Sequence, residues 1–149
     1  MTYFYQMKNL YFLFVLLFAA CSKSEPADVA KLSGYWEIQK VTSDGEQKKE
    51  YKMNDTFDHF EINGKTGSRS KVLPQFDGTF QTNEQPEYFT VSVADGKTYL
   101  NYKTQYATWK EQIVSLEDSV LVTKNNQDLE FNYKRTGPLN FTGSGKTIK

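Results

Sequence analysis

Beyond its first 33 residues, the chain is built from short runs in which apolar and polar residues alternate. The clearest run is 87–93, where Phe89, Val91 and Val93 share one face and Thr90 and Ser92 share the other. Alternation with a period of two is typical of a half-buried strand, and no segment sustains the 3.6-residue period of a helix. Comparable runs lie at 35–41, 57–63, 98–103, 108–114, 120–124 and 129–135.

Turn-forming pairs separate these runs. Asp-Gly and Asn-Gly favour tight hairpins because both of their residues tolerate positive φ. Such pairs are Asp44-Gly45, Asn63-Gly64, Asp77-Gly78 and Asp95-Gly96. Short connections between strands predict an all-β, antiparallel meander of eight or nine strands. Alternation alone leaves open whether this meander closes into a barrel or forms a β-sandwich.

The first 20 residues follow a different pattern. Residues 10–18 are an unbroken apolar run with Lys8 just before it. The run is too short for a membrane-spanning helix, which takes roughly 20 apolar residues. We therefore interpret residues 1–20 as a signal peptide. Translation from Met7 would place the positive charge directly behind the initiator, so either Met1 or Met7 could start the protein.

The regions on both sides of the strands are polar. Residues 21–31 contain Ser, Lys and Pro, which predicts a flexible tether with one helical turn after Pro26. Residues 137–149 are rich in Gly, Ser and Thr and predict a tail. The folded domain is therefore expected over residues 32–136.

The only cysteine, Cys21, stands where the apolar run stops, behind Ala19 and Ala20. This stretch resembles the lipobox of bacterial lipoproteins, although Phe18 stands where that family usually has an aliphatic residue. The resemblance implies that Cys21 is lipidated and becomes the new N-terminus. Ser22, in place of Asp, is similar to an outer-membrane address, on the periplasmic or the outer face. The alternatives are a free thiol or ordinary signal cleavage.

A second resemblance joins the two ends of the strand region. Gly34-Tyr35-Trp36 opens the first strand, and Arg135 ends the last one. This arrangement resembles the lipocalin family and its short bacterial relatives. It implies that Trp36 plugs one end of the barrel, that Arg135 covers Trp36, and that Tyr35 lies outside against the turn or the tail. In a β-sandwich, Trp36 would be an ordinary core residue and Arg135 a surface residue.

Little in the sequence suggests catalysis, and we expect a protein that is not an enzyme and uses no cofactor. His59 is the only histidine, which argues against a metal site and against a Ser–His–Asp relay. Glu111 shares a face with Trp109 and could point into a barrel, either in an ion pair or beside water. A formal net charge of zero gives no reason to expect a nucleic-acid partner.

Two functions fit these observations. The first is a tethered lipoprotein that binds a small apolar or amphipathic ligand inside the barrel. Strand alternation predicts the wall of such a site at Phe89, Leu100, Tyr102, Trp109 and Ile113. The alternative is a filled barrel whose surface binds a protein or a glycan of the cell envelope, or inhibits an enzyme.

Overall fold

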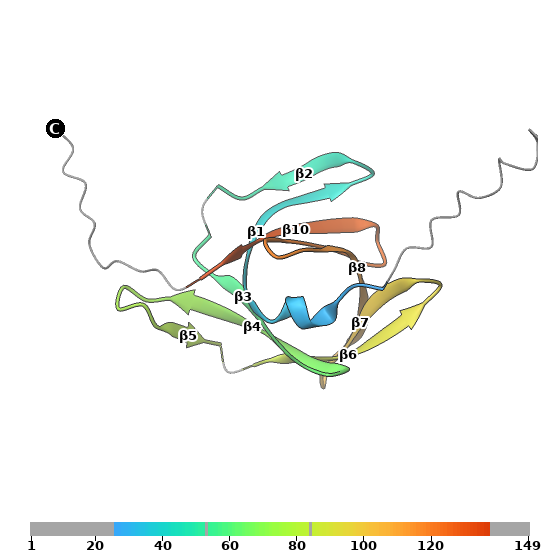
Figure 1. Cartoon of the computed structure of the whole chain (residues 1–149). Helices are drawn as coiled ribbons and strands as arrows, with labels where there is room; N and C mark the ends of the chain where they lie inside the picture. Colours follow the sequence, from blue (N-terminus) through green and yellow to red (C-terminus); the bar gives the residue numbers. More distant parts are fainter. Residues whose placement is uncertain (1–25, 53, 84, 138–149) are drawn as a thin grey trace, which may run out of the picture.

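The computed structural model describes residues 26–52, 54–83 and 85–137 (Figure 1). The possible starts at Met1 and Met7, the lipidation at Cys21 and the polar tail after residue 137 lie outside the described residues. The described elements are the 3₁₀ helix η2 (Val29–Leu32) and ten strands. The strands are β1 (Gly34–Ser43), β2 (Glu46–Glu50), β3 (Phe57–Asn63), β4 (Thr66–Pro74), β5 (Phe80–Thr82), β6 (Glu87–Ala94), β7 (Lys97–Lys103), β8 (Thr108–Leu116), β9 (Val120–Lys124) and β10 (Leu129–Thr136).

Eight of these strands close into an antiparallel barrel. The sheet runs β10-β9-β8-β7-β6-β4-β3-β1, and β10 pairs again with β1 so that no barrel edge is left open. Trp36 lies opposite Arg135 in that closing pair. The prediction of an all-β barrel is confirmed, and the closure excludes the sandwich that the alternation had left open.

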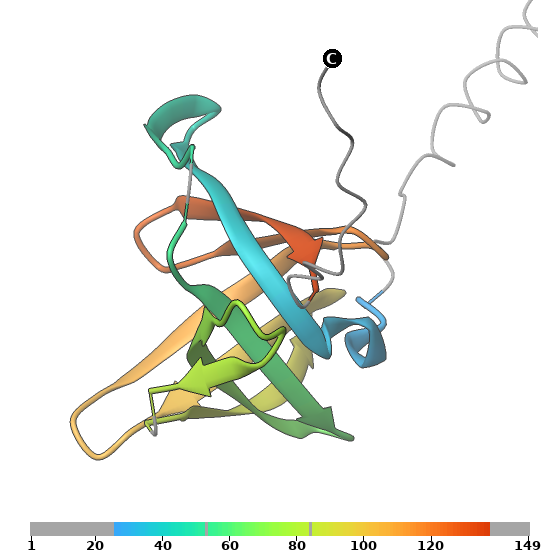
Figure 2. The ribbon, with the colours of Figure 1, turned by 90° about the vertical axis from the view of Figure 1, so that its left-hand side faces the viewer.

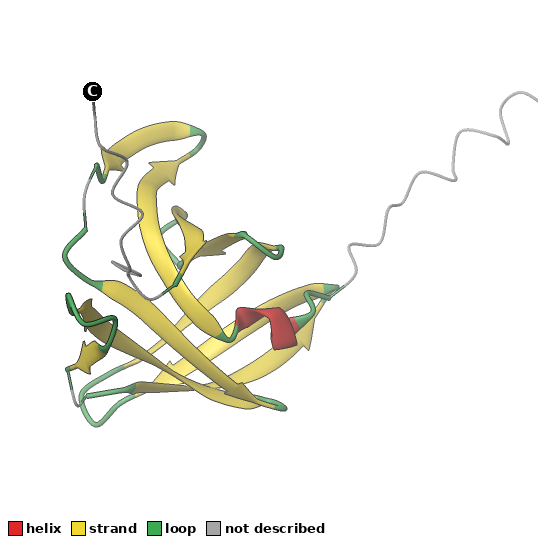
Figure 3. Ribbon diagram, turned by 60° about the vertical axis from the view of Figure 1, so that its left-hand side comes forward, coloured by secondary structure: helices red, strands yellow, loops and turns green. Residues whose placement is uncertain are grey.

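The two remaining strands explain why ten are found where eight or nine were expected. β2 pairs with the far part of β1 and forms a hairpin that projects from the barrel, and all its residues are exposed (Figures 1 and 3). β5 is three residues long and pairs only with the end of β4. Both are edge strands. Their sequences, EQKKE and FQT, show too little alternation of apolar and polar residues to predict a strand.

The barrel has a closed end and an open end. η2 and the first residues of β1 lie at the closed end, while the β1–β2 hairpin reaches past the opposite end (Figures 2 and 3). The strand directions place the β5–β6 and β7–β8 connections at the open end. Side chains of the closed half form the apolar core, which contains Leu32, Trp36, Phe60, Leu100 and Leu121 at no more than 1% exposure.

At the closed end, Trp36 and Arg135 lie together. The Arg135 guanidinium carbon is 4.2 Å from the centroid of the Trp36 ring, and the Trp36 indole Nε1 donates to the Leu32 carbonyl at 2.8 Å. Arg135 also donates to the carbonyls of Lys31, Ser33 and Asp118. One side chain therefore joins η2, the start of β1 and the β8–β9 turn.

Tyr35 lies outside the barrel, as expected, and among the described residues its cover comes from β3 and β5. Its ring stacks on His59 at 4.3 Å and on Phe80 of β5 at 4.1 Å, with interplanar angles of 16° and 15°. Alternation placed Tyr35 correctly on the outer face, but it could not show that the short strand β5 brings an aromatic ring there. His59 is half-buried in this stack.

Within the described residues, no helix is long and apolar enough to cross a membrane. The same residues contain no group of His, Cys, Asp and Glu side chains that could hold a metal ion.

Candidate functional site

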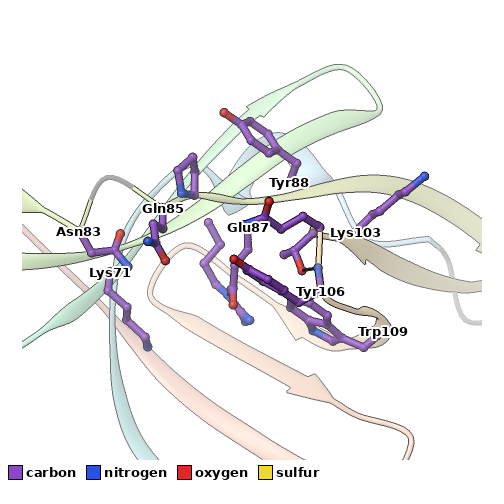
Figure 4. A pocket seen from close by; sticks show the side chains of 12 residues that line it. Lys71, Asn83, Gln85, Glu87, Tyr88, Lys103, Tyr106 and Trp109 are labelled. Atoms are coloured by element: carbon purple, nitrogen blue, oxygen red, sulfur yellow. Dashed lines mark hydrogen bonds and ion pairs between the residues drawn. The ribbon is translucent and has the colours of Figure 1, made fainter.

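A pocket of about 890 Å³ occupies the open end of the barrel (Figure 4). The strands contribute Arg69, Lys71, Glu87, Tyr88, Lys103 and Trp109 to its lining. The connections β5–β6 and β7–β8 contribute Asn83, Gln85, Pro86, Thr104, Gln105 and Tyr106. The site therefore combines rigid strand positions with two loops.

Strand register decides which lining residues face the interior. Tyr88 and Lys103 are paired across β6 and β7, next to the inward-facing pair Phe89 and Tyr102. Because side chains alternate along a strand, Tyr88 and Lys103 belong to the outer face. Figure 4 shows both pointing away from the space bounded by Glu87, Tyr106 and Trp109.

An ionic cluster lies beneath this pocket. Arg69 Nε bonds Glu87 Oε2 at 2.8 Å, and Arg69 Nη1 lies 3.2 Å from Glu111 Oε1. The Arg69 and Glu111 side chains are only 13% and 7% exposed, whereas Glu87 is 38% exposed. Burial by itself lowers the pKa of Arg69, but the attraction of Tyr102 and Glu111 more than offsets this and the pKa is raised. Arg69 is therefore a permanent buried cation.

A second ion pair lies beside the cluster. Lys71 Nζ is 2.6 Å from Asp58 Oδ1, and the Asp58 side chain is 3% exposed. β3 and β4 bring these residues together because Asp58 lies opposite Lys71 in the register, just as Phe60 lies opposite Arg69. The cations that face the pocket from β4 thus already have carboxylate partners.

Trp109 is held in a fixed orientation at the side of the pocket. Its ring stacks on Tyr102 with a centroid distance of 4.8 Å and an interplanar angle of 6°. Its indole Nε1 donates to Glu111 Oε1 at 3.1 Å, and Arg69 lies 4.6 Å from the centroid of the Tyr102 ring on which Trp109 rests. The ionic cluster and the aromatic pair therefore support each other.

The five side chains predicted to contact a ligand lie at different depths. Trp109 lines the pocket, and Tyr102 supports it from the side. Phe89, Leu100 and Ile113 are packed in the core at 3%, 0% and 5% exposure. Alternation placed all five on the inner face, but it carries no information on depth, which depends on where each strand crosses the barrel.

Sequence reasoning missed Arg69, Lys71 and Glu87. Arg69 and Lys71 stand in a polar run, "KTGSRSK", that resembles an ordinary exposed segment. One signal was available: Glu111 shares a face with Trp109, and a buried carboxylate needs a cation. The structure identifies that cation as Arg69, so of the two alternatives for Glu111 it has the ion pair.

A second hollow, of about 740 Å³, crosses β4, β6, β7 and β8. Its lining includes the outward residues Thr90, Asn101 and Lys110, together with Phe89, Tyr102 and Trp109 of the predicted ligand wall. The first pocket is the one that the barrel mouth and its loops enclose.

The lipocalin-like domain family model matches residues 32–123, which is more than half of the chain. The chain belongs to the lipocalin-like domain family. Lipocalin-like proteins are generally binding proteins rather than enzymes. No curated protein sequence matches this chain.

Among solved structures, the lipocalin-like chain is similar to a lipocalin-like protein from Bacteroides uniformis, with 12% identity and a TM-score of 0.43. That match covers 71% of this chain and 99% of the other. It is also similar to apocrustacyanin C2, with 11% identity and a TM-score of 0.43, covering 73% of this chain and 63% of the other. Neither resemblance assigns a ligand to this lipocalin-like protein.

Proposed function

We propose that this protein is a binding lipoprotein of the cell envelope, which takes a small amphipathic ligand into the open end of its barrel. The observation that carries the proposal is the pocket of about 890 Å³, with Trp109 fixed at its side. Small-molecule sites are concave and largely preformed, with apolar surface and a few placed polar groups. This pocket combines the rings of Trp109 and Tyr106 with charged and amide side chains.

Tryptophan emission tests this proposal directly, because the chain has two tryptophans. Trp36 is fully buried at the closed end, so Trp36→Phe leaves Trp109 as the only emitter. Palmitate, haemin, cholesterol and a set of neutral disaccharides are then titrated against this variant. A saturable change in Trp109 emission with any of them supports the ligand site.

The matched control is Trp109→Phe, which leaves only Trp36 as emitter. Its emission should stay constant with palmitate, cholesterol and the disaccharides, because Trp36 lies beneath η2 at the closed end. Haemin binding is followed by its own absorbance, since a haem quenches both tryptophans by energy transfer. No emission change in Trp36→Phe with any probe, together with no heat of binding in the unmodified protein, would contradict the proposal. The surface-interaction alternative would then replace it.

The membrane part of the proposal rests on Cys21. Replacing its thiol by a hydroxyl in Cys21→Ser removes the nucleophile that acylation needs. We expect this variant to lose incorporation of an alkyne-labelled fatty acid and to leave the outer-membrane fraction, whereas Ser22→Ala keeps the label. A labelled, membrane-bound Cys21→Ser protein would refute the lipid anchor.

A further inference from the structure

The cations that face the pocket are already paired with carboxylates of the protein, which limits the kind of ligand that the pocket can favour. Arg69 is held by Glu87 and Glu111, and Lys71 is held by Asp58. An anionic ligand would have to compete with one of these carboxylates for its cation, at the cost of leaving a buried charge without its partner. A neutral ligand meets no such competition.

The core below the pocket excludes long apolar chains. Tyr102 and Phe60 flank Arg69, whose guanidinium carbon lies 4.6 Å and 5.9 Å from their ring centroids. Beneath them, Phe89 and Leu100 are almost fully buried. The ionic cluster and these rings separate the mouth from the core, so a ligand must lie across the mouth and cannot extend down the barrel.

Trp109 offers such a ligand a flat apolar surface. One face of its ring is covered by Tyr102, and the indole is part of the pocket lining. Stacking and the hydrogen bond to Glu111 fix the indole before any ligand arrives. A surface that is already ordered does not lose side-chain entropy on binding.

Amide side chains surround this surface. Asn83 and Gln85 line the pocket from the β5–β6 connection, and Gln105 lines it from the β7–β8 loop. Within the described residues, none of these three amide groups has a hydrogen-bond partner. Each amide can donate and accept at once, which suits hydroxyl groups that also do both.

We infer that the ligand of this pocket is a neutral saccharide. The apolar C–H face of a sugar ring lies on Trp109, and its ring of hydroxyls meets Gln85, Gln105 and the outer oxygen of Glu87. This inference rests on the proposed function, because it names the ligand class of the same pocket. It predicts discrimination against both fatty acids and anionic sugars.

Binding is measured by the emission of Trp109 in Trp36→Phe and by calorimetry on the unmodified protein. The probes are maltose, cellobiose, lactose and N,N′-diacetylchitobiose, with glucuronate and palmitate for comparison. At least one neutral disaccharide should bind, and the anionic glucuronate and palmitate should bind more weakly. Gln85→Ala and Gln105→Ala should each weaken binding by about fivefold, the equivalent of one hydrogen bond. Gln127→Ala removes an exposed amide outside the pocket and should leave binding unchanged.

Three results would overturn the inference. A response to palmitate or to another non-carbohydrate without a response to any disaccharide would refute the saccharide but leave the proposed function standing. The absence of all binding would refute both. Disaccharide binding that is insensitive to Gln85→Ala and Gln105→Ala would place the sugar outside this pocket. Far-ultraviolet circular dichroism of each variant establishes that lost binding does not reflect lost folding.

Discussion

Gly34 leaves room for Arg135. A Cβ atom placed on Gly34 would lie 2.5 Å from Nη1 of Arg135, and the φ of Gly34 is +128°. The backbone conformation is strained for any other residue, and a side chain here would displace the guanidinium of Arg135. This relationship explains why glycine stands two residues before Trp36: the guanidinium that covers the indole passes directly over Gly34.

Replacement of Gly34 by alanine should therefore be costly. Gly34→Ala combines backbone strain with a clash against Arg135, and we expect it to lower the free energy of unfolding by at least about 2 kcal/mol. Gly45→Ala is the matched control, because Gly45 also has positive φ but no atom within 4 Å of a Cβ. It should cost about 1 kcal/mol. Urea denaturation measures both, and equal losses would contradict the clash.

Trp36 and Arg135 should be energetically coupled. Trp36→Ala in the core should cost about 3–5 kcal/mol, and Arg135→Ala should cost less. The cation over the indole contributes about 0.5–2 kcal/mol, so the double variant should be less damaged than the sum of the single changes by about that amount. Additive losses in denaturant titrations would mean that the cation–π contact contributes nothing to stability.

The ion pair of Arg69 and Glu111 should be far more sensitive to removal of one partner than of both. Arg69→Met leaves the Glu111 carboxylate buried without a cation, which should cost about 3–5 kcal/mol. Adding Glu111→Gln should recover part of this loss. Glu87→Gln changes a more exposed partner of Arg69 and should cost about 1 kcal/mol or less. Thermal or urea unfolding measures all three, and a double variant less stable than Arg69→Met would contradict the buried-charge explanation.

Two buried tyrosines should weaken the fold in alkali. Burial raises the pKa of Tyr102 well above its usual 10.0 and also raises the pKa of Tyr133. In the unfolded chain these phenols ionise near pH 10, while in the folded protein they stay protonated. The folded state then binds more protons, so stability is full below about pH 10 and falls as the pH rises above it.

Absorbance at 295 nm and urea midpoints between pH 8 and pH 11 test this pH dependence. Tyr102→Phe should reduce the loss of stability above pH 10. Tyr106→Phe should not reduce it, because Tyr106 is 87% exposed in the folded protein. The Tyr102 hydroxyl has no hydrogen-bond partner among the described residues, so Tyr102→Phe should also leave stability at pH 7 unchanged or raise it by about 1 kcal/mol. A marked loss at pH 7 would indicate a partner for this hydroxyl.

Much of the fold could be predicted because three sequence features all indicate an antiparallel barrel. These are the alternation of apolar and polar residues, the turn-forming pairs, and Trp36 and Arg135 at the two ends of the strand region. The runs around Phe89, Leu100 and Trp109 give the inner face of each strand, and Asp95-Gly96 gives the register of the β6–β7 hairpin. The closure of the barrel depends on β10 meeting β1. In the sequence, only the placement of Trp36 and Arg135 at the two ends of the strand region indicated this closure.

The candidate site could be predicted only in part. Trp109 follows from alternation, but Arg69 does not, because a charged residue in a polar run has no local property that marks it as buried. Its burial comes from the register that places it opposite Phe60 and beside Glu87. The amides of Gln85 and Gln105 lie in loops, where no periodicity relates sequence to direction.

The chain enters the barrel at its closed end, and this fixes how an anchored molecule would face its surroundings. Ala27 is held there by a hydrogen bond from its backbone N–H to the Thr98 hydroxyl at 2.9 Å. Only five residue steps separate Cys21 from Pro26, a reach of at most about 18 Å. A lipid on Cys21 would therefore hold the barrel with Trp36 and Arg135 toward the bilayer and Trp109 toward the water. In that orientation the pocket would open to the aqueous phase, at the end of the barrel opposite the lipid.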